Sequence, residues 1–484
     1  MLDAHAVLIV GYESPIDPLT QDRNLPFVTV LGKTLLAHGL DSLIRSQFKS
    51  IVVLCPEIYS DTIQDKVGSM DENEMEITVR SPQQEESPVE AIASLVKDGL
   101  LTTDTLIIPA NLVTDLSFPE MMRRFYLATR PCEDGADAHI MVCMSALHPS
   151  APQTDNKDQD ANVWVTGTAE VDVVSQTRPL VWLSAHESFN QAEKINVSQY
   201  VASKHGTVTY TAYRRPPHAV VLNVAALQHI IANDDCSGNF DHDLLPYLAH
   251  QQSKPGASSP RVHLVDHCGA AFLGRVGTRW SYIETVNALI KHYGASKDAL
   301  FDVPPNRKGS EYPDRVEAVK SWIPNPHVNA LPLFEVAELE MPEKAALMKD
   351  LEGLKPREKK KREKAIDKAL KAAKNLKLIC VRSSYVDGTA TVEWAPEDPA
   401  ASIMDLDDSV ATVVQSSVIM PGASVGPRCT LDGVIVCENG RVGAGCRLVN
   451  CIVGPGAVVE PGTDNRASTE RKQAFVNIAQ TARV

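Results

Sequence analysis

The sequence predicts an α/β protein in which helices cover a mainly parallel sheet and a short β-solenoid follows. Two observations support this fold class. Apolar strand-like runs alternate with helical patterns in the first part of the chain, and aliphatic residues recur at a fixed spacing between Ile419 and Val459. The chain has 484 residues, 44% of them hydrophobic, which is enough for more than one domain with a buried core.

The strand-like runs at the start of the chain are short and continuously apolar, as expected for strands buried on both faces. The first covers residues 6–10 and ends at Gly11, and a helical pattern follows over residues 34–48. The alternation continues through residues 51–55, 91–96, 105–109, 138–144 and 219–223. Ser117 and Glu120 predict a capping box at the start of a further helix.

Three rows of aliphatic residues define the repeat near the end of the sequence. The rows are Ile419, Val436 and Val453; Val425, Val442 and Val459; and Leu431 and Leu448. A β-solenoid needs this pattern because each inward side chain stacks on its copy one coil away, while glycine and proline turn the corners. The alternative is an ordinary β-hairpin region. The repeat predicts little more than two coils, which must pack on other residues because about three repeats are usually needed for stability.

The ten cysteines are scattered along the chain and include no C-x-x-C pair. Cys429 and Cys446 fall one coil apart in the repeat, on a row of small residues. We interpret them as reduced core thiols rather than disulfide partners or zinc ligands.

Composition and pattern divide the chain into four predicted regions. Residues 1–300 form the α/β domain, residues 301–400 a linker with a basic helical insertion, residues 401–463 the solenoid and residues 464–484 a tail. Two stretches are rich in residues that interrupt regular structure, and they predict a surface insertion at 149–161 and a linker at Pro304–Pro326.

The basic insertion at residues 355–377 stands out against an acidic chain. It holds eleven Lys or Arg and three acidic residues, a net charge of +8, whereas the rest carries 36 basic and 58 acidic residues. It is either a contact for RNA, the ribosome or an acidic partner, or a solvated helix. The acidic remainder argues against direct nucleic-acid binding by the protein as a whole. No stretch is apolar enough for a membrane span, and the start lacks a basic signal-peptide pattern, so we expect no membrane association and a cytoplasmic location.

A strand that runs into a glycine turn and then a helix is a place where α/β proteins bind phosphate. The turn from Gly11 to Thr20 contains Pro18-Leu19-Thr20 and resembles the signature loop of sugar-nucleotide pyrophosphorylases. Glu13 stands where that family has a glycine, Pro15 where it has an arginine, and Phe27 where it has a lysine. A pyrophosphorylase needs those cations to stabilise charge on the leaving pyrophosphate, so their loss predicts a vestigial phosphate loop.

The metal position shows a similar loss. In the resembling family a strand ends in Gly-Asp, whose carboxylate holds magnesium, and this chain has Ala110-Asn111 there. An Asn carbonyl lacks the charge that makes magnesium binding strong. Asn111 therefore marks a vestigial metal position, and we expect no catalytic residues, no cofactor and no bound metal.

A degenerate nucleotidyltransferase-like, Rossmann-like domain followed by a left-handed β-helix resembles the gamma-subunit family of eukaryotic translation initiation factor 2B. The resemblance covers roughly residues 5–295 and 400–463. It is carried by the order of several short stretches: Leu25-Pro26, Lys33 to Leu36, Asn111 to Asp115, Asn239 to Leu248 and Ser281 to Glu284.

This resemblance implies that the chain acts by binding other proteins and has no catalytic residues of its own. The chain would pair with the epsilon subunit, which carries an additional helical exchange domain, and with the other subunits of the complex. Together they would release GDP from initiation factor 2, the substrate of the exchange reaction. About twenty residues follow the repeat, too few for such an exchange domain. Two other functions stay open: an active sugar-nucleotide pyrophosphorylase with an unusual loop, and a catalytically silent regulatory subunit of such an enzyme.

Overall fold

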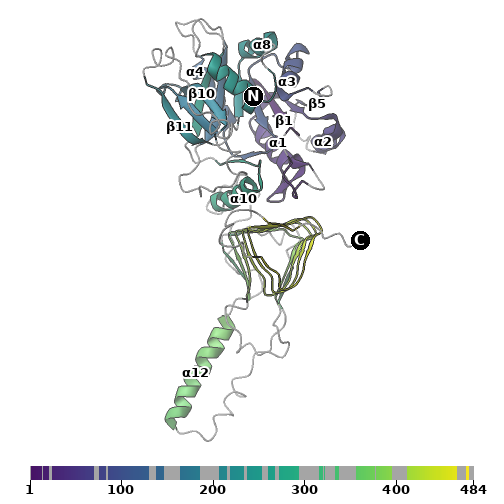
Figure 1. Ribbon diagram of the computed structural model, residues 1–484, viewed down its shortest axis with the longest axis vertical. Coiled ribbons are helices and arrows are strands. Elements are labelled where there is room, and N and C mark those ends of the chain that lie inside the picture. Colours follow the sequence, from purple (N-terminus) through teal and green to yellow (C-terminus); the bar gives the residue numbers. More distant parts are fainter. Residues whose placement is uncertain are drawn as a thin grey trace. The chain divides into compact units, whose positions relative to one another are not determined.

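The computed structural model divides the chain into two compact units (Figure 1). The first comprises Met1–Ile16 and Arg23–Tyr282, and the second Asp17–Asp22 and Ile283–Val484. The structure describes residues 2–12, 15–20, 24–69, 76–82, 86–129, 138–145, 164–185, 207–214, 219–233, 237–252, 260–267, 272–293, 316–319, 321, 333–336, 356–375, 378–394, 411–465 and 476–478. Residues 149–161, predicted as a surface insertion, lie outside them.

A ten-stranded mixed sheet forms the centre of the first unit, with strand order β11-β9-β10-β13-β8-β12-β6-β1-β4-β5. Strands β6, β1, β4 and β5 pair in parallel, as predicted, while β12 is antiparallel to both of its neighbours. The strands are β1 (Leu2–Ile9), β4 (Phe48–Leu54), β5 (Glu76–Arg80), β6 (Thr105–Pro109), β8 (His139–Ser145), β9 (Trp164–Thr168), β10 (Arg178–Ala185), β11 (Thr209–Arg214), β12 (Ala219–Leu222) and β13 (Arg261–His267). Two short ribbons add β2 (Thr29–Val30) with β3 (Lys33–Thr34), and β7 (Leu112–Thr114) with β14 (Leu273–Arg275).

Helices cover both faces of this sheet, because alternate residues of a strand point to opposite sides. Val7 and Ile9 of β1 belong to one core cluster with residues of α3, α8 and α9, and Leu8 belongs to the other with residues of α1, α2 and α4. These helices are α1 (Leu35–Arg45), α2 (Glu57–Ser69), α3 (Pro88–Lys97), α4 (Phe118–Ala128), α8 (Val224–Ala232) and α9 (Leu245–Gln251), with a short 3-10 helix η1 (Leu25–Phe27) and a short π-helix η2 (Phe240–Leu244). Helix α10 (Arg279–Tyr293) begins in the first unit and continues into the second. None of the helices that the structure describes is long and apolar enough to cross a bilayer.

The predicted helix at Ser117 forms, but only half of its capping box does. Ser117 Oγ accepts a hydrogen bond from the backbone N–H of Glu120 at 3.4 Å. The Glu120 carboxylate pairs instead with Arg123 and Arg124, one turn further along the helix. These two cations compete for the carboxylate, so the reciprocal bond to the Ser117 backbone is absent from the contacts of the described residues.

The second unit contains a β-solenoid whose strands stack in three parallel sheets, visible in Figure 1 as the walls of a triangle. All three predicted aliphatic rows are confirmed: Ile419, Val436 and Val453 are paired in register, as are Val425, Val442 and Val459, and Leu431 and Leu448. The three sheets are β15 (Val316–Val319), β17 (Ile379–Arg382), β20 (Thr412–Gln415), β23 (Thr430–Asp432), β26 (Arg447–Val449) and β29 (Asp464–Asn465); β18 (Tyr385–Val386), β21 (Val418–Ile419), β24 (Ile435–Val436), β27 (Cys451–Val453) and β30 (Val476–Ile478); and β16 (Leu333–Val336), β19 (Thr391–Trp394), β22 (Ser424–Val425), β25 (Arg441–Val442) and β28 (Val458–Val459).

The solenoid is longer than predicted at both ends. Strands β15 to β19 lie in the predicted linker 301–400, β15 falls within Pro304–Pro326, and β29 and β30 lie in the predicted tail. The prediction was wrong for β15 to β19 because insertions hide the period: Ile379 pairs with Thr412 across a much longer stretch of chain than the one that separates Thr430 from its partner Arg447. Strand β29 keeps the regular spacing, but Asn465 pairs with Leu448 there, so the aliphatic row is interrupted. The basic helix α12 (Pro356–Asn375) is part of another such insertion, which follows β16 and precedes β17.

The corners and the small-residue row follow the same repeat. Ser416, Gly433 and Asn450 occupy equivalent corners of successive coils, and all three have positive φ. The Cys429 thiol donates to the carbonyl of Gly443 at 3.0 Å, and the Cys446 thiol makes the corresponding bond to Glu460 at 3.1 Å. All seven described cysteines are buried and form no disulfide with one another, and the predicted core position of Cys429 and Cys446 is confirmed.

Candidate functional site

The carboxyl ends of β1 and β6 form the candidate site. The two strands are parallel neighbours, and the chain continues from β1 to β4 on one side and reaches β6 on the other, which makes this a topological switch point. Ligands of open α/β sheets bind outside the carboxyl ends of strands at such points. A hydrogen bond of 2.7 Å from the Ala110 N–H to the Ile9 carbonyl holds the two ends together, so Gly11 and Asn111 follow adjacent strands.

Tyr59 of α2 packs against Gly11 at the end of β1. Gly11 has a φ of +84°, and a Cβ atom there would lie 2.8 Å from Tyr59 Cε2 and 3.1 Å from Pro56 Cδ. The glycine is therefore required both by its backbone conformation and by the close approach of a tyrosine ring. The Tyr59 ring therefore fills the space into which a side chain at position 11 would project.

Phe27 extends the same packing. Its ring lies edge-to-face on Tyr59, with ring centroids 6.1 Å apart and an interplanar angle of 81°. Phe27 is the residue that stands where the pyrophosphorylase pattern has a lysine. Lys66 places its Nζ 5.5 Å from the centroid of the Phe27 ring, on α2 rather than at the loop. The structure thus joins two of the predicted vestigial positions, Gly11 and Phe27, through one aromatic residue.

The other two predicted loop positions contribute no described contacts to the site. Pro15 is exposed, and Glu13 lies outside the described residues. Tyr12, next to Gly11, packs against the core, and burial raises its pKa to about 12, with the charge of Glu86 adding to the shift. Tyr12 is therefore neutral at physiological pH and supplies no charge for chemistry.

Asn111 is buried and forms hydrogen bonds with Val276, a residue distant in sequence. Its Nδ2 donates to the Val276 carbonyl at 2.8 Å, and the Val276 N–H donates to the Asn111 carbonyl at 2.9 Å. The side chain is 3% exposed, and its Oδ1 has no hydrogen-bond partner among the described residues. The amide that stands at the predicted metal position therefore ties the end of β6 to the segment between β14 and α10. Across the described residues, no group of three His, Cys, Asp or Glu side chains is arranged to hold a metal ion.

Arg275 directly precedes Val276, the hydrogen-bond partner of Asn111. Its Nη1 lies 2.5 Å from Asp241 Oδ2, and both side chains are 17% exposed. Asp241 lies in η2, within the stretch Asn239 to Leu248. The Asp241 carboxylate therefore pairs with the guanidinium charge of Arg275 within the first unit.

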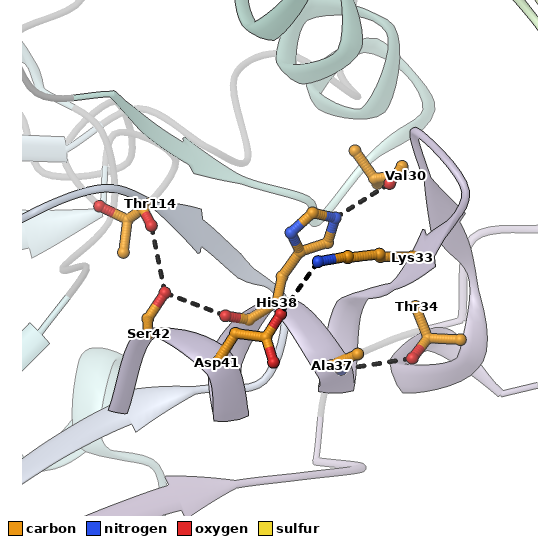
Figure 2. A network of polar contacts seen from close by, with 8 residues as sticks. All are labelled: Val30, Lys33, Thr34, Ala37, His38, Asp41, Ser42 and Thr114. Carbon is orange, nitrogen blue, oxygen red and sulfur yellow. Dashed lines mark hydrogen bonds and ion pairs between the residues drawn. The ribbon is translucent and has the colours of Figure 1, made fainter. Parts of the chain in front are cut away.

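A second network joins α1 to β7, as Figure 2 shows. Ser42 Oγ contacts the carbonyl oxygens of His38 and Thr114 at 2.9 and 3.1 Å, and His38 Nε2 lies 2.9 Å from the Val30 carbonyl oxygen. Thr114 Oγ1 in turn donates to the Phe272 carbonyl at 2.8 Å. Thr34, in the stretch Lys33 to Leu36, caps α1, and Thr114, in the stretch Asn111 to Asp115, contacts Ser42 of the same helix. Both stretches therefore contact α1.

Sequence reasoning missed Tyr59, Val276 and the pair Asp241–Arg275. Val276 is 165 positions from Asn111 and Arg275 is 34 positions from Asp241, and neither pair has a local pattern that would reveal it. Tyr59 stands in the first turn of a predominantly exposed helix, where an aromatic residue gives no signal of a site.

Two family models match parts of this chain. A model described as nucleotidyl transferase matches residues 6–136, and one described as the GlmU-like C-terminal hexapeptide matches residues 408–477. The fold is that of a nucleotidyltransferase-like domain followed by a left-handed β-helix. The second match begins shortly before β20, so β15 to β19 precede it. No curated protein matches the chain.

Proposed function

We propose that this chain is a non-catalytic subunit of the translation initiation factor 2B exchange complex. In this role it pairs with the epsilon subunit and promotes GDP release from initiation factor 2 without catalytic residues of its own. The observation that carries the non-catalytic part is the packing of Tyr59 between Gly11 and Phe27, together with the engagement of Asn111 by Val276.

The physical reason is that nucleotidyl transfer needs charge at these positions. A triphosphate and its leaving pyrophosphate require cations and a metal held by carboxylate oxygens. Here an aromatic contact occupies the glycine turn, an amide ties two backbone segments, and Arg275 is paired with Asp241. Each position serves packing, which supports a binding role for the domain.

The assignment to the gamma-subunit family rests on the order of the resembling stretches and on their use in the fold. Tyr282 Oη, in the stretch Ser281 to Glu284, donates to the Thr29 carbonyl at 2.8 Å. The stretches that enter α1 and follow β6 belong to the network of Figure 2. These contacts support a structural role for the resembling stretches.

A second candidate is a sugar-nucleotide pyrophosphorylase or its silent regulatory subunit. The two family models favour it, because a nucleotidyl transferase domain and a GlmU-like hexapeptide region occur together in this chain. Such an enzyme would join a sugar 1-phosphate to a nucleoside triphosphate and release pyrophosphate. The retained switch point is the place where that reaction would occur.

Two assays separate these functions. In the first, the purified chain is given nucleoside triphosphates, magnesium and a panel of sugar 1-phosphates. We expect no pyrophosphate release. A turnover number above about one per second, which is within the ordinary range of enzymes, would contradict the non-catalytic proposal.

The second assay measures release of labelled GDP from initiation factor 2. It is run with this chain alone, with the epsilon subunit alone and with both. We expect stimulation above the rate of the epsilon subunit only when both are present, because a binding surface supplied in trans raises the local concentration of substrate at the catalytic domain. Equal rates with and without this chain would remove its role in exchange, and strong stimulation by this chain alone would overturn its non-catalytic character.

A further inference from the structure

The inserted helix α12 presents basic residues along one face. Arg357, Lys360, Lys361, Lys364 and Lys368 fall within an arc of about 100° on a helix with 3.6 residues per turn, and they span about 16 Å at a rise of 1.5 Å per residue. All five side chains are exposed. We name these five residues the basic stripe.

The three acidic residues of α12 flank the basic stripe: Glu358, Glu363 and Asp367 lie three residues from Lys361, Lys360 and Lys364 respectively. Glu358 and Glu363 lie off this arc and Asp367 lies at its margin. None of the five cations forms an ion pair with another residue that the structure describes. The positive charge of the stripe is therefore directed at solvent or at a partner.

This arrangement is unfavourable for the helix itself. Arg357 and Lys361, Lys360 and Lys364, and Lys364 and Lys368 are like charges four residues apart, which destabilise a helix. Arg357 also lies in the first turn, where the helix dipole favours anions. A partner with regularly spaced negative charges would relieve both effects.

The chemistry of the stripe selects among possible partners. The arc that the stripe occupies on α12 contains no apolar or aromatic position, whereas stable protein interfaces have an apolar or aromatic core and are depleted of lysine. The apolar residues Ile366 and Leu370 lie on the opposite face. Single-stranded nucleic acid also needs aromatic stacking platforms. We propose that the basic stripe of α12 binds the phosphate backbone of duplex RNA. The choice of RNA over DNA rests on the proposed function in translation, while the phosphate contact follows from the stripe.

The overall acidity of the chain does not cancel this local charge. Of 47 basic and 61 acidic residues, nine and three respectively lie in α12. Charges separated by more than about 8 Å are largely screened at physiological ionic strength, so the field at the stripe is set mainly by the residues of α12, which are predominantly basic. This proposal departs from the expectation, based on net charge, that the protein does not bind nucleic acid directly.

The test uses the full-length protein and a fluorescent RNA duplex of about 20 base pairs, with binding followed by anisotropy. Five phosphate contacts correspond to a slope of about −4.5 in the logarithm of affinity against that of salt, which is about a 500-fold loss between about 50 and about 200 mM. A DNA duplex and a poly-glutamate peptide of equal charge are the competing probes.

The decisive variant carries K360E, K361E and K364E. A matched control carries K97E, R441E and R447E, which makes the same change in net charge at exposed positions outside α12. We expect at least about tenfold weaker RNA binding and a slope near −2 for the first variant only. Equal loss in both variants, no RNA binding, or preference for poly-glutamate or DNA over RNA would overturn the proposal. None of these outcomes bears on the GDP-release assay, so the two proposals fail separately.

Discussion

Arg275 and Asp241 form a salt bridge of 2.5 Å in which both side chains are 17% exposed. The pair joins β14 to η2, and Val276, directly after the arginine, holds Asn111. An ion pair that is largely withdrawn from water is weak evidence of net stabilisation, but removing one partner leaves a poorly solvated charge.

We expect R275A to destabilise the first unit by about 2 kcal/mol, because the Asp241 carboxylate loses its charged hydrogen-bond donor. The double variant R275A/D241A should lose less than the sum of the two single variants. Hydrogen exchange of amides in β7 and β14 measures the local free energy of opening.

The control is K33A, which removes the more exposed 3.3 Å pair with Asp41 and should cost well under about 1 kcal/mol. Additive single effects would show that the pair is not coupled.

The solenoid rows predict a sharp contrast between two neighbouring positions. Val442 is 3% exposed and pairs with Val425 and Val459 on the adjacent coils, whereas Arg441 beside it is exposed. V442D should therefore bury an unpaired carboxylate at a cost of about 3 kcal/mol or more, and R441D should cost little. Urea unfolding and hydrogen exchange of β22, β25 and β28 measure the difference. Similar stability of the two variants would contradict the inward direction of Val442.

The solenoid could be predicted from sequence where its period is unbroken. Successive coils there have equal length, so the aliphatic rows are visible as spacing alone. The coil from β17 to β19 was missed because extra residues separate it from the next coil, on which Ile379 pairs with Thr412. Strand β15 was missed for the same reason, since the insertion that contains α12 precedes its partner β17. Inserted segments leave the stacking intact but remove the period from the sequence.

The candidate site was predictable only at its strand ends. Gly11 and Asn111 follow apolar runs, so sequence places them at one edge of the sheet. Their contacts come from distant segments: Tyr59 packs against Gly11, and Val276 forms hydrogen bonds with Asn111. Single-sequence patterns report local periodicity, and these contacts have none.

Burial of His38 predicts a stability that depends on pH. His38 is 2% exposed, and burial lowers its pKa from 6.5 to about 4, with the bond to Val30 opposing the shift and the charge of Lys33 adding to it. Because the folded-state pKa is the lower one, the unfolded chain takes up the proton first as the pH falls. The stabilisation from neutral His38 is therefore complete above about pH 6.5 and is lost progressively between about 6.5 and 4.

This loss amounts to about 2 kcal/mol at about pH 5 relative to about pH 7.5. H38Q retains a donor for the Val30 carbonyl and removes the titrating group, so its stability should change less over the same range. Urea unfolding of both proteins at the two pH values measures the difference. An unchanged pH dependence in H38Q would assign the effect to other groups.

The vestigial metal position supplies the last prediction, through the single change N111D. An aspartate there would restore the carboxylate of the pyrophosphorylase pattern, but it would remove the Nδ2 donor to the Val276 carbonyl and place a carboxylate oxygen near that carbonyl. Because Asn111 is 3% exposed, we expect a loss of about 2 kcal/mol or more and no recovery on addition of millimolar magnesium. N111L, which removes the same donor without adding charge, is the matched control and should be less destabilised than N111D. Thermal unfolding with and without magnesium measures both variants. Magnesium-dependent stabilisation of N111D, absent in N111L, would show that other ligands of a metal site are still in place and would favour the catalytic alternative.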